Sequence, residues 1–274
     1  MDLFSTASRV LPAGKSGCGA GQQGALQGVA SVKEVEIRGR YEVAAIIAVA
    51  VDSEGRREIV GLHIGPSEAE TFWSTFLRSL HKRGLKGVKL VISDAHEGLK
   101  GAIRRVFGAT WQRCRVHWMR SALAHVPKGQ QTMVAAALRQ AFLQPDQGSA
   151  RRVWRQMADQ FRPRWPKLGA LMDESEHEVL AYLSFPAQHR TKLHSTNPLE
   201  RLNKEVKRRA DVVGIFPGEA AIVRLIGAVL LEANDEWQLQ HRYMQVEAMA
   251  ELVPPQIEGE GTTTHALEVP PQAA

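Results

Sequence analysis

The amino-acid sequence predicts an α/β fold in which a mixed sheet is followed by a long helical region. Three strand-like stretches come first and are joined by short connections, and helices then alternate with further strands. From about Trp118 onward the pattern is helical. Strands joined by tight turns pair antiparallel and strands joined through a helix pair parallel, so we expect both kinds of pairing in one sheet.

The first three strands are expected to lie side by side. An extended stretch with apolar residues occupies 32–37, and residues 41–51 are almost continuously apolar, which indicates a strand buried on both faces. The turn at 52–55 ends in Gly55, which suits a positive φ. A third strand at 58–64 then returns beside the second.

Two amphipathic helices follow. Ser67 and Glu70 have the spacing of a capping box, and Gly84 ends the helix that this box opens. The second helix is expected at 96–107. The apolar stripe of the first helix consists of Phe72, Trp73, Phe76, Leu77 and Leu80.

Two further strands alternate with these helices. Residues 88–92 form a buried strand that ends at Ser93 and Asp94, and a short strand is expected at 110–113. The resulting order, β-β-β-α-β-α-β, is that of the ribonuclease H-like fold. A Rossmann or flavodoxin-like sheet would begin with βαβ, and no glycine-rich phosphate loop follows a strand in this sequence.

The composition is that of a globular protein with a basic balance. The chain has 274 residues, of which 44% are hydrophobic, so it can bury a sizeable core. Its 35 Lys and Arg against 29 Asp and Glu give a net charge of +6, which favours a polyanionic partner without requiring one.

Cysteine usage and hydropathy indicate a soluble, cytoplasmic protein. Cys18 and Cys114 are the two cysteines, too few for a disulfide framework. The N-terminus has no unbroken apolar core of a signal peptide. The longest apolar run, at 43–51, is about half the ~20 residues that a membrane helix needs.

The two ends of the chain differ in composition from its middle. Residues 1–28 are rich in Gly, Ala and Gln without a hydrophobic period, so we expect a flexible leader. Residues 253–274 are rich in Pro, Gly and Thr and are expected to be disordered. Between them, helical patterns run from about 118 to 188 and from 198 to about 250.

Asp94 is the first candidate for a functional residue. It stands at the carboxyl end of a buried strand, where open α/β sheets place their sites. An Asp after a strand also serves in many proteins only to cap the next helix. The spacing leaves both interpretations open.

Glu200 is the second candidate, within HSTNPLERLNKEVKRR at 194–209. A structural explanation exists, because Asn197 could cap the helix and Pro198 suits its first position, which makes Glu200 part of a capping box. The helix behind Glu200 favours a functional role, because its positive charges could hold phosphates while the carboxylate holds a cation. These positive residues are Arg201, Lys204, Lys207, Arg208 and Arg209, against one acid, Glu205.

Cys114 and His117 have the C-x-x-H spacing of half a zinc site. No second pair of this kind is present, and neither His96 nor His125 has a convincing spacing to complete a site. We therefore expect a structural contact between Cys114 and His117 rather than a zinc ion.

Several of these segments together resemble the mutator-type family of bacterial insertion-sequence transposases. The resemblance spans about residues 40–250, and its specificity lies in the order of the motifs. They are GPSEAETFW (65–73), VISDAHEGLK (91–100), WQRCRVHWMR (111–120), HVPKG (125–129), HSTNPLERLNKEVKRR (194–209) and DVVGIFP (211–217).

The resemblance implies a DDE-type DNA transposase with an α/β, ribonuclease H-like mixed sheet, a mostly helical insertion and C-terminal helices. Residues 29–117 and 194–252 would form the catalytic domain, and 118–193 the insertion. Asp94 and Glu200 would be the second and third catalytic acids. Both would be ligands of Mg²⁺ or Mn²⁺, since two-metal sites of this kind activate the attacking oxygen and stabilise the leaving oxygen.

The same resemblance assigns roles to the residues around the acids. Cys114, His117, Asn197 and Asn203 would support the site. The partners would be DNA, at the element ends and at the target, and further transposase chains in a homo-oligomer. The residues expected to bind the DNA backbone are Arg201, Lys204, Lys207, Arg208 and Arg209.

The first acid of the family should lie on the opening strand, at Gly28 or Val29, and neither residue is acidic. Glu34 and Glu36 come too late, and an odd shift along a strand would turn a side chain to the other face. The family's long upstream DNA-binding region is also missing from the sequence. We therefore expect a truncated or decayed copy whose cleavage and strand transfer are impaired.

The alternative is a catalytically dead fragment that binds DNA or an intact transposase. A metal-dependent nuclease of the same fold but another family would need an acid on the first strand, which the sequence does not offer at the expected position.

Overall fold

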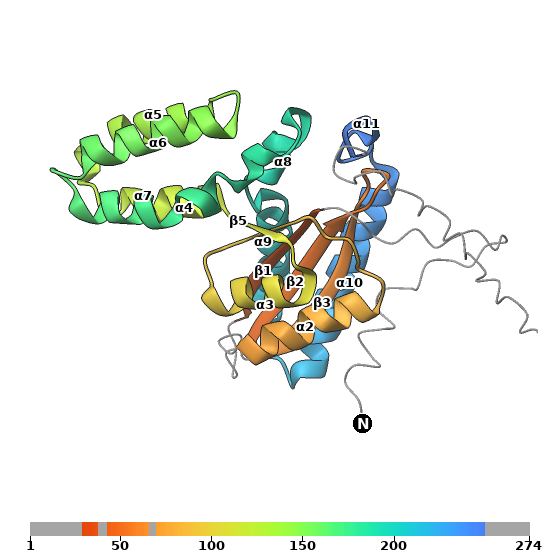
Figure 1. Ribbon diagram of the computed structural model, residues 1–274. Coiled ribbons are helices and arrows are strands. Elements are labelled where there is room, and N and C mark those ends of the chain that lie inside the picture. The colour runs from red at the N-terminus through yellow and green to blue at the C-terminus, as the bar shows by residue number, and fades with distance from the viewer. Residues whose placement is uncertain (1–28, 38–42, 66–69, 250–274) are drawn as a thin grey trace, which may run out of the picture.

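The structure of the chain is a computed structural model that describes residues 29–37, 43–65 and 70–249 (Figure 1). It consists of a five-stranded mixed sheet with helices on both faces and a helical extension beyond one edge. The expected leader at 1–28 and tail at 253–274 lie outside the described residues.

The strands are arranged in the order β3-β2-β1-β4-β5. β1 (Val29–Ile37), β2 (Val43–Val51) and β3 (Arg57–Gly65) pair antiparallel. β4 (Leu90–Ser93) pairs parallel with β1, and β5 (Thr110–Arg113) pairs parallel with β4. The predicted element order and the two kinds of pairing are confirmed.

Helices cover both faces of the sheet, and this explains the apolar character of β2. α2 (Glu70–Lys82) and α3 (Glu97–Phe107) pack on one face, and α9 (Asn197–Val213) and α10 (Glu219–Leu239) pack on the other (Figure 1). All residues at 44–51 are buried, so the prediction of a strand buried on both faces is confirmed.

Two glycines allow close approaches that a side chain would block. Gly55 has φ 75° in the β2–β3 turn, as expected, and its carbonyl accepts hydrogen bonds from the backbone N–H groups of Tyr243 and Met244 at 2.7 and 2.9 Å. A Cβ on Gly61 would lie 2.6 Å from Leu80 Cδ2, so a side chain at this position would displace Leu80 of α2.

The capping box expected for Ser67 and Glu70 lies partly outside the described residues, because Ser67 is not among them. The Glu70 carboxylate forms an ion pair with Arg105 Nη2 at 2.5 Å, which links α2 to α3. Gly84 follows the helix with φ 112°, in agreement with its expected role at the helix end.

The predicted helical region between the sheet and the last helices is confirmed. It forms an extension that projects away from β5 (Figure 1). Its elements are α4 (Arg115–Leu123), α5 (Lys128–Phe142), α6 (Gln147–Phe161), α7 (Pro166–Val179), two 3-10 turns (Ala181–Ser184 and Ala187–His189) and α8 (Arg190–Leu193). After it come α9, α10 and the short α11 (Val246–Met249).

Two buried tryptophans hold the extension together. The rings of Trp118 and Trp154 lie 4.7 Å apart between their centroids, and each indole N–H has a partner. Trp118 donates to Ser175 Oγ at 2.6 Å, and Trp154 donates to the Met172 carbonyl at 2.9 Å. The apolar cluster around them continues into the sheet at Ile92, so the extension and the sheet share part of one core.

Gln112 of β5 joins the extension to the sheet through buried hydrogen bonds. Its Nε2 donates to the Val179 carbonyl at 2.9 Å, and its Oε1 accepts from the Tyr182 backbone N–H at 2.7 Å. A buried side chain amide is costly unless paired, so this arrangement fixes how α7 meets the sheet edge.

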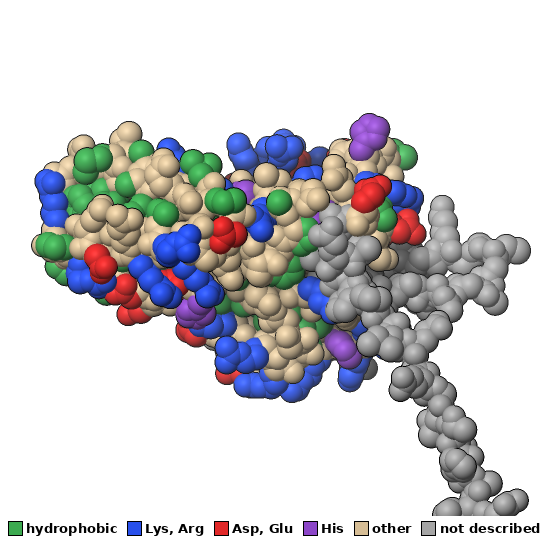
Figure 2. All heavy atoms as spheres, turned by 45° about the horizontal axis from the view of Figure 1, so that its top comes forward, with side chains coloured by type: hydrophobic (Ala, Val, Ile, Leu, Met, Phe, Trp, Pro, Cys, Tyr) green, Lys and Arg blue, Asp and Glu red, His purple; other side chains and the backbone are tan. Residues whose placement is uncertain are grey.

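The surface carries charges of both signs. On the face drawn in Figure 2, Lys and Arg side chains are spread over the sheet region and the helical extension, with acidic side chains among them. Within the described ranges, none of the helices combines the length and apolarity that a membrane span requires.

We expect Trp118→Ala to lower the free energy of unfolding by about 3–5 kcal/mol, because it empties a large buried volume and leaves Ser175 without its donor. Urea unfolding followed by circular dichroism measures this. Met133→Ala on α5 is the matched control, since Met133 is 56% exposed and should change stability little. Equal effects of the two substitutions would contradict the assignment of this core.

Candidate functional site

Asp94 follows β4 directly but does not cap the next helix. The N-cap of α3 is His96, whose Nδ1 accepts from the Leu99 backbone N–H at 3.2 Å. The interpretation of Asp94 as a simple cap is therefore wrong. Its carboxylate lies instead among side chains from β1, α4 and the segment before α4.

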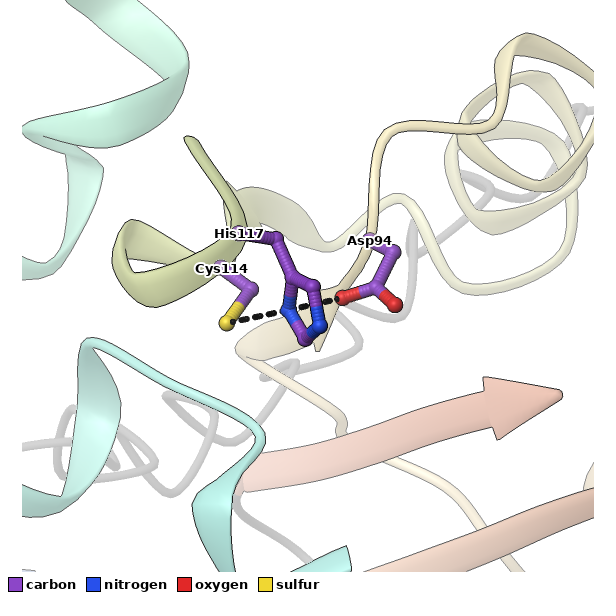
Figure 3. Close-up of side chains that lie close together, drawn as sticks. All are labelled: Asp94, Cys114 and His117. Carbon is purple, nitrogen blue, oxygen red and sulfur yellow. Dashed lines mark hydrogen bonds and ion pairs between the residues drawn. The ribbon is translucent and has the colours of Figure 1, made fainter. Parts of the chain in front are cut away.

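His117 of α4 lies between Asp94 and Cys114, and all three side chains point toward one another (Figure 3). Its Nδ1 is 2.7 Å from Asp94 Oδ1 and 3.1 Å from Cys114 Sγ. At this distance the contact with Asp94 is an ion pair when the imidazole is protonated. The sulfur of Cys114 is fully buried and accepts from the N–H and Oγ1 of Thr196, both at 3.4 Å.

These contacts shift the titration of all three groups. The contact with Asp94, followed by that with Cys114, raises the pKa of His117 to about 9. Burial raises the pKa of Asp94, but His117 and Lys33 outweigh it, so the pKa lies below its usual value. Burial likewise raises the pKa of the Cys114 thiol, and His117 and Thr196 reverse that effect and lower it.

Glu200 reaches the same place from the first turn of α9. The N-cap of this helix is Thr196, without a side-chain cap hydrogen bond, and Asn197 is its exposed first residue. The capping-box interpretation of Asn197 and Glu200 is therefore wrong. Glu200 Oε1 instead lies 3.3 Å from Lys33 Nζ and 3.3 Å from His117 Nε2.

Lys33 is the residue that the sequence analysis missed. Its Nζ lies 3.3 Å from Glu200 Oε1, 3.7 Å from Asp94 Oδ2 and 3.3 Å from His117 Nε2. The parallel pairing of β1 with β4 explains its position, because Ser31 lies opposite Ile92 and Lys33 follows two residues later, as Asp94 does. The available signal was a charged residue directly after the buried Val32 in an expected strand.

Val29, one of the two positions expected for a first acid, does not contribute a side chain to the site. Val29 is buried in the apolar cluster with Leu90 and Ile92, and Gly28 lies outside the described residues. Glu34 and Glu36 lie on β1, farther along the strand than Lys33. Among the described residues of β1, the side chain that contacts Asp94 and Glu200 is thus the cation Lys33.

The ligand atoms of Asp94, Cys114 and His117 lie within 4.8 Å of one another and could hold a metal ion. One oxygen, one sulfur and one nitrogen donor suit a borderline metal such as Zn²⁺ better than the hard ions Mg²⁺ or Mn²⁺. Of the two histidines considered from spacing, His96 caps α3 and His125 is exposed.

The basic residues of α9 divide into two groups. Glu205 forms ion pairs with Arg208 at 2.6 Å and with Arg209 at 2.7 Å, which lowers the pKa of Glu205 to about 2. The other three are exposed and take part in no ion pair between described residues. They are Arg201, Lys204 and Lys207.

A groove of about 690 Å³ lies between α9 and α10, and several of the basic residues of α9 line it. The guanidinium of Arg57 stacks on Trp237 within it, 3.6 Å from the ring centroid. Asn197 also lines the groove, whereas Asn203 is buried one turn after Glu200. Further Lys and Arg residues that line it are Lys192, Arg201, Lys204, Arg208 and Arg209.

Comparison with protein families finds a match over residues 29–240 to the family described as "Transposase, Mutator family". The chain is 42% identical over 208 residues to the transposase for insertion sequence element IS1081 of Mycobacterium tuberculosis, covering 76% of this chain and 50% of that protein. It is 39% identical over 218 residues to the IS406 transposase of Burkholderia multivorans, covering 78% and 56%.

A further relative is the transposase for insertion sequence element IS256 in transposon Tn4001 of Staphylococcus aureus, which is 39% identical over 194 residues, covering 70% of this chain and 50% of that protein. The chain thus spans about half the length of the curated relatives it matches.

The imidazole of His117 is expected to titrate at about pH 9 in metal-free buffer, and Asp94→Asn should lower this value because it removes the carboxylate that stabilises the imidazolium. NMR titration of the ring signals measures both. Since folding raises this pKa, the associated stability is complete below about pH 6.5 and is lost as pH rises through about 9.

Asp159→Asn on α6 is the control for that experiment, because Asp159 pairs with Arg162 away from this site. It should leave the His117 titration unchanged. A wild-type value at or below the ordinary 6.5 would contradict the ion pair with Asp94.

Proposed function

The chain belongs to the Mutator family of transposases, and we propose that it takes part in the DNA transposition of a bacterial insertion sequence. The observation that carries the proposal is the convergence of two carboxylates. Asp94 follows β4 and Glu200 begins α9, on either side of the helical extension, yet both lie within ion-pair distance of Lys33 and His117.

The fold proposed for this function is ribonuclease H-like. The strand order β3-β2-β1-β4-β5, with β1 central and antiparallel to β2 but parallel to β4, supports it. Residues 29–117 and 194–252 would form the DDE-type catalytic domain and 118–193 the insertion. The return of α9 and α10 to the sheet that carries β1 and β2 supports this division.

The residues present do not fit the pair of Mg²⁺ or Mn²⁺ ions that the family resemblance implies. An ammonium group stands between the two carboxylates, and the nearest further donors to Asp94 are a thiol and an imidazole. Hard divalent ions bind oxygen-rich sites, and a neighbouring positive charge repels them. We therefore propose that cleavage and strand transfer are impaired in this chain.

DNA binding does not depend on the metal ions. The exposed cations of α9 lie on the helix that carries Glu200, and the groove beside them adds Arg57 and Lys192. Basic side chains of this kind hold the phosphate backbone without reading the sequence. The proposed contacts are with DNA at the element ends and at the target, and the residues concerned are Arg201, Lys204, Lys207, Arg208 and Arg209.

A second candidate function is that of a catalytically dead binding protein. The position of Lys33 favours this second function, because its ammonium pairs with both carboxylates. The basic residues Arg201, Lys204 and Lys207 of α9 stay exposed. Such a chain would bind DNA or would associate with copies of itself or with an intact transposase. Co-purification with a longer relative, without nuclease activity, is the result that supports this function.

The purified chain is expected not to cleave element-end DNA in Mg²⁺ or Mn²⁺, because no pair of ions fits beside Lys33. Gel analysis of end-labelled duplexes measures this. Divalent-ion-dependent cleavage by the wild type that disappears in Asp94→Ala would contradict the proposed impairment. An unrelated duplex of equal length is the control for nonspecific nicking.

Lys204→Gln with Lys207→Gln is expected to weaken duplex binding and to reduce the slope of log affinity against log salt by about 2, since each lost phosphate contact contributes about 0.9. Fluorescence anisotropy over a range of salt concentrations measures the slope. Glu205→Gln should have the opposite effect, because it frees Arg208 and leaves Arg209 with only its contact to Glu232 at 3.5 Å.

Arg152→Gln is the control, because this exposed residue of α6 lies in the helical extension and bonds to Ser149. If it weakens binding as much as the pair on α9 does, the DNA contacts lie elsewhere.

A further inference from the structure

Lys33 occupies a position where a lysine is unusual. It lies in β1, which pairs with β2 on one side and with β4 on the other, and its neighbour Val32 is buried. The Lys33 side chain itself is 14% exposed. Lysines are rarely this buried unless a partner of opposite charge is present.

The partners of Lys33 are two carboxylates from distant parts of the chain. Its Nζ lies 3.3 Å from Glu200 Oε1 and 3.7 Å from Asp94 Oδ2. The carboxylates are 32% and 40% exposed, so water screens them only in part. Two carboxylates that share one small site repel each other, and a cation placed between them removes this repulsion.

His117 closes the arrangement on its other side. Its Nδ1 contacts Asp94 Oδ1 at 2.7 Å, and its Nε2 lies 3.3 Å from Glu200 Oε1. Each carboxylate therefore faces both the ammonium of Lys33 and the ring of His117. The carboxylates are held by protein groups alone, without a requirement for another cation.

We propose that Lys33 is the built-in cation of this site, which holds Asp94 and Glu200 together and excludes Mg²⁺ or Mn²⁺ from the space between them. A metal ion bound to both carboxylates would have to share their oxygens with the ammonium and would be repelled by it. The inference concerns the charge arrangement of the cluster and does not depend on the proposed role in DNA transposition.

A single substitution should convert the site from one that excludes Mn²⁺ and Mg²⁺ to one that binds them. Lys33→Asp shortens the side chain, removes the positive charge and adds a third carboxylate beside Asp94 and Glu200. Three carboxylates in one place supply the oxygen ligands that Mn²⁺ and Mg²⁺ bind. Lys33→Met removes the charge while keeping most of the side-chain volume, and so separates the effect of charge from that of new ligands.

The test measures Mn²⁺ binding by isothermal titration calorimetry on the full chain, without DNA. Wild type is expected to show no binding at this site and no change in melting temperature with Mn²⁺ or EDTA. Lys33→Asp is expected to bind Mn²⁺ with a Kd at least about a hundredfold below the highest Mn²⁺ concentration at which the wild type shows no binding, to melt lower in EDTA and to regain stability with Mn²⁺. Adding Asp94→Asn to Lys33→Asp should abolish the binding.

Lys100→Met is the matched control. Lys100 is also a partly buried lysine paired with a carboxylate, Glu178, but it lies outside the cluster. Removing it should lower stability without creating Mn²⁺ binding. If it creates binding as strong as Lys33→Asp does, the effect does not belong to this site and the proposal is overturned.

A second measurement keeps the proposal testable if Lys33→Asp does not fold. Mn²⁺ is paramagnetic and broadens NMR signals of nearby nuclei, so excess Mn²⁺ should leave the His117 ring signals sharp in the wild type and broaden them in Lys33→Met. Broadening in the wild type, or tight Mn²⁺ binding by it, would falsify the proposal. DNA binding is measured separately by anisotropy. Failure of the proposal on Lys33 can therefore be told apart from failure of the proposed role in DNA transposition.

Discussion

The parallel pairing of β1 with β4 is the constraint on which the site depends. It places Ser31 opposite Ile92, so that Lys33 emerges beside Asp94 at the point where β4 ends. A shift of one residue would turn the opposite face of β1 toward Asp94, because side chains alternate along a strand. Burial of Val29 on one face and Ala30 on the other specifies this register, since either shift would disturb an apolar cluster.

The helical extension has a geometric consequence for the site. The chain leaves the sheet after β5, passes through α4 to α8 and returns as α9, which packs against the same face as α10. Gln112 and the tryptophan pair fix the extension to the edge of the sheet. Glu200 can thus meet residues of β1 and α4 although a long stretch of chain separates them.

Charge decides what such a site can bind. Two carboxylates near the end of a sheet form an attractive place for a divalent ion, provided that nothing else neutralises them. In this chain an ammonium and an imidazole already do so, and a buried sulfur lies beside the imidazole. The basic face of α9 is affected differently, because Glu205 neutralises two of its arginines while the remaining cations stay exposed.

The sequence by itself determined the order of strands and helices and the burial of β2, and it singled out Asp94 and Glu200 as candidate site residues. These features depend on local periodicity and on motifs, which involve residues close together in the sequence. The tertiary structure alone decided that Glu200 does not close a capping box, that His96 caps α3 in place of Asp94, and that Lys33 stands between the two acids. The physical reason is that contacts between β1, β4 and α9 depend on strand register and helix packing, which a local pattern does not fix. Counting along the hairpin pointed to Gly28 or Val29, whereas hydrogen bonding between neighbouring strands brought Lys33 to the site.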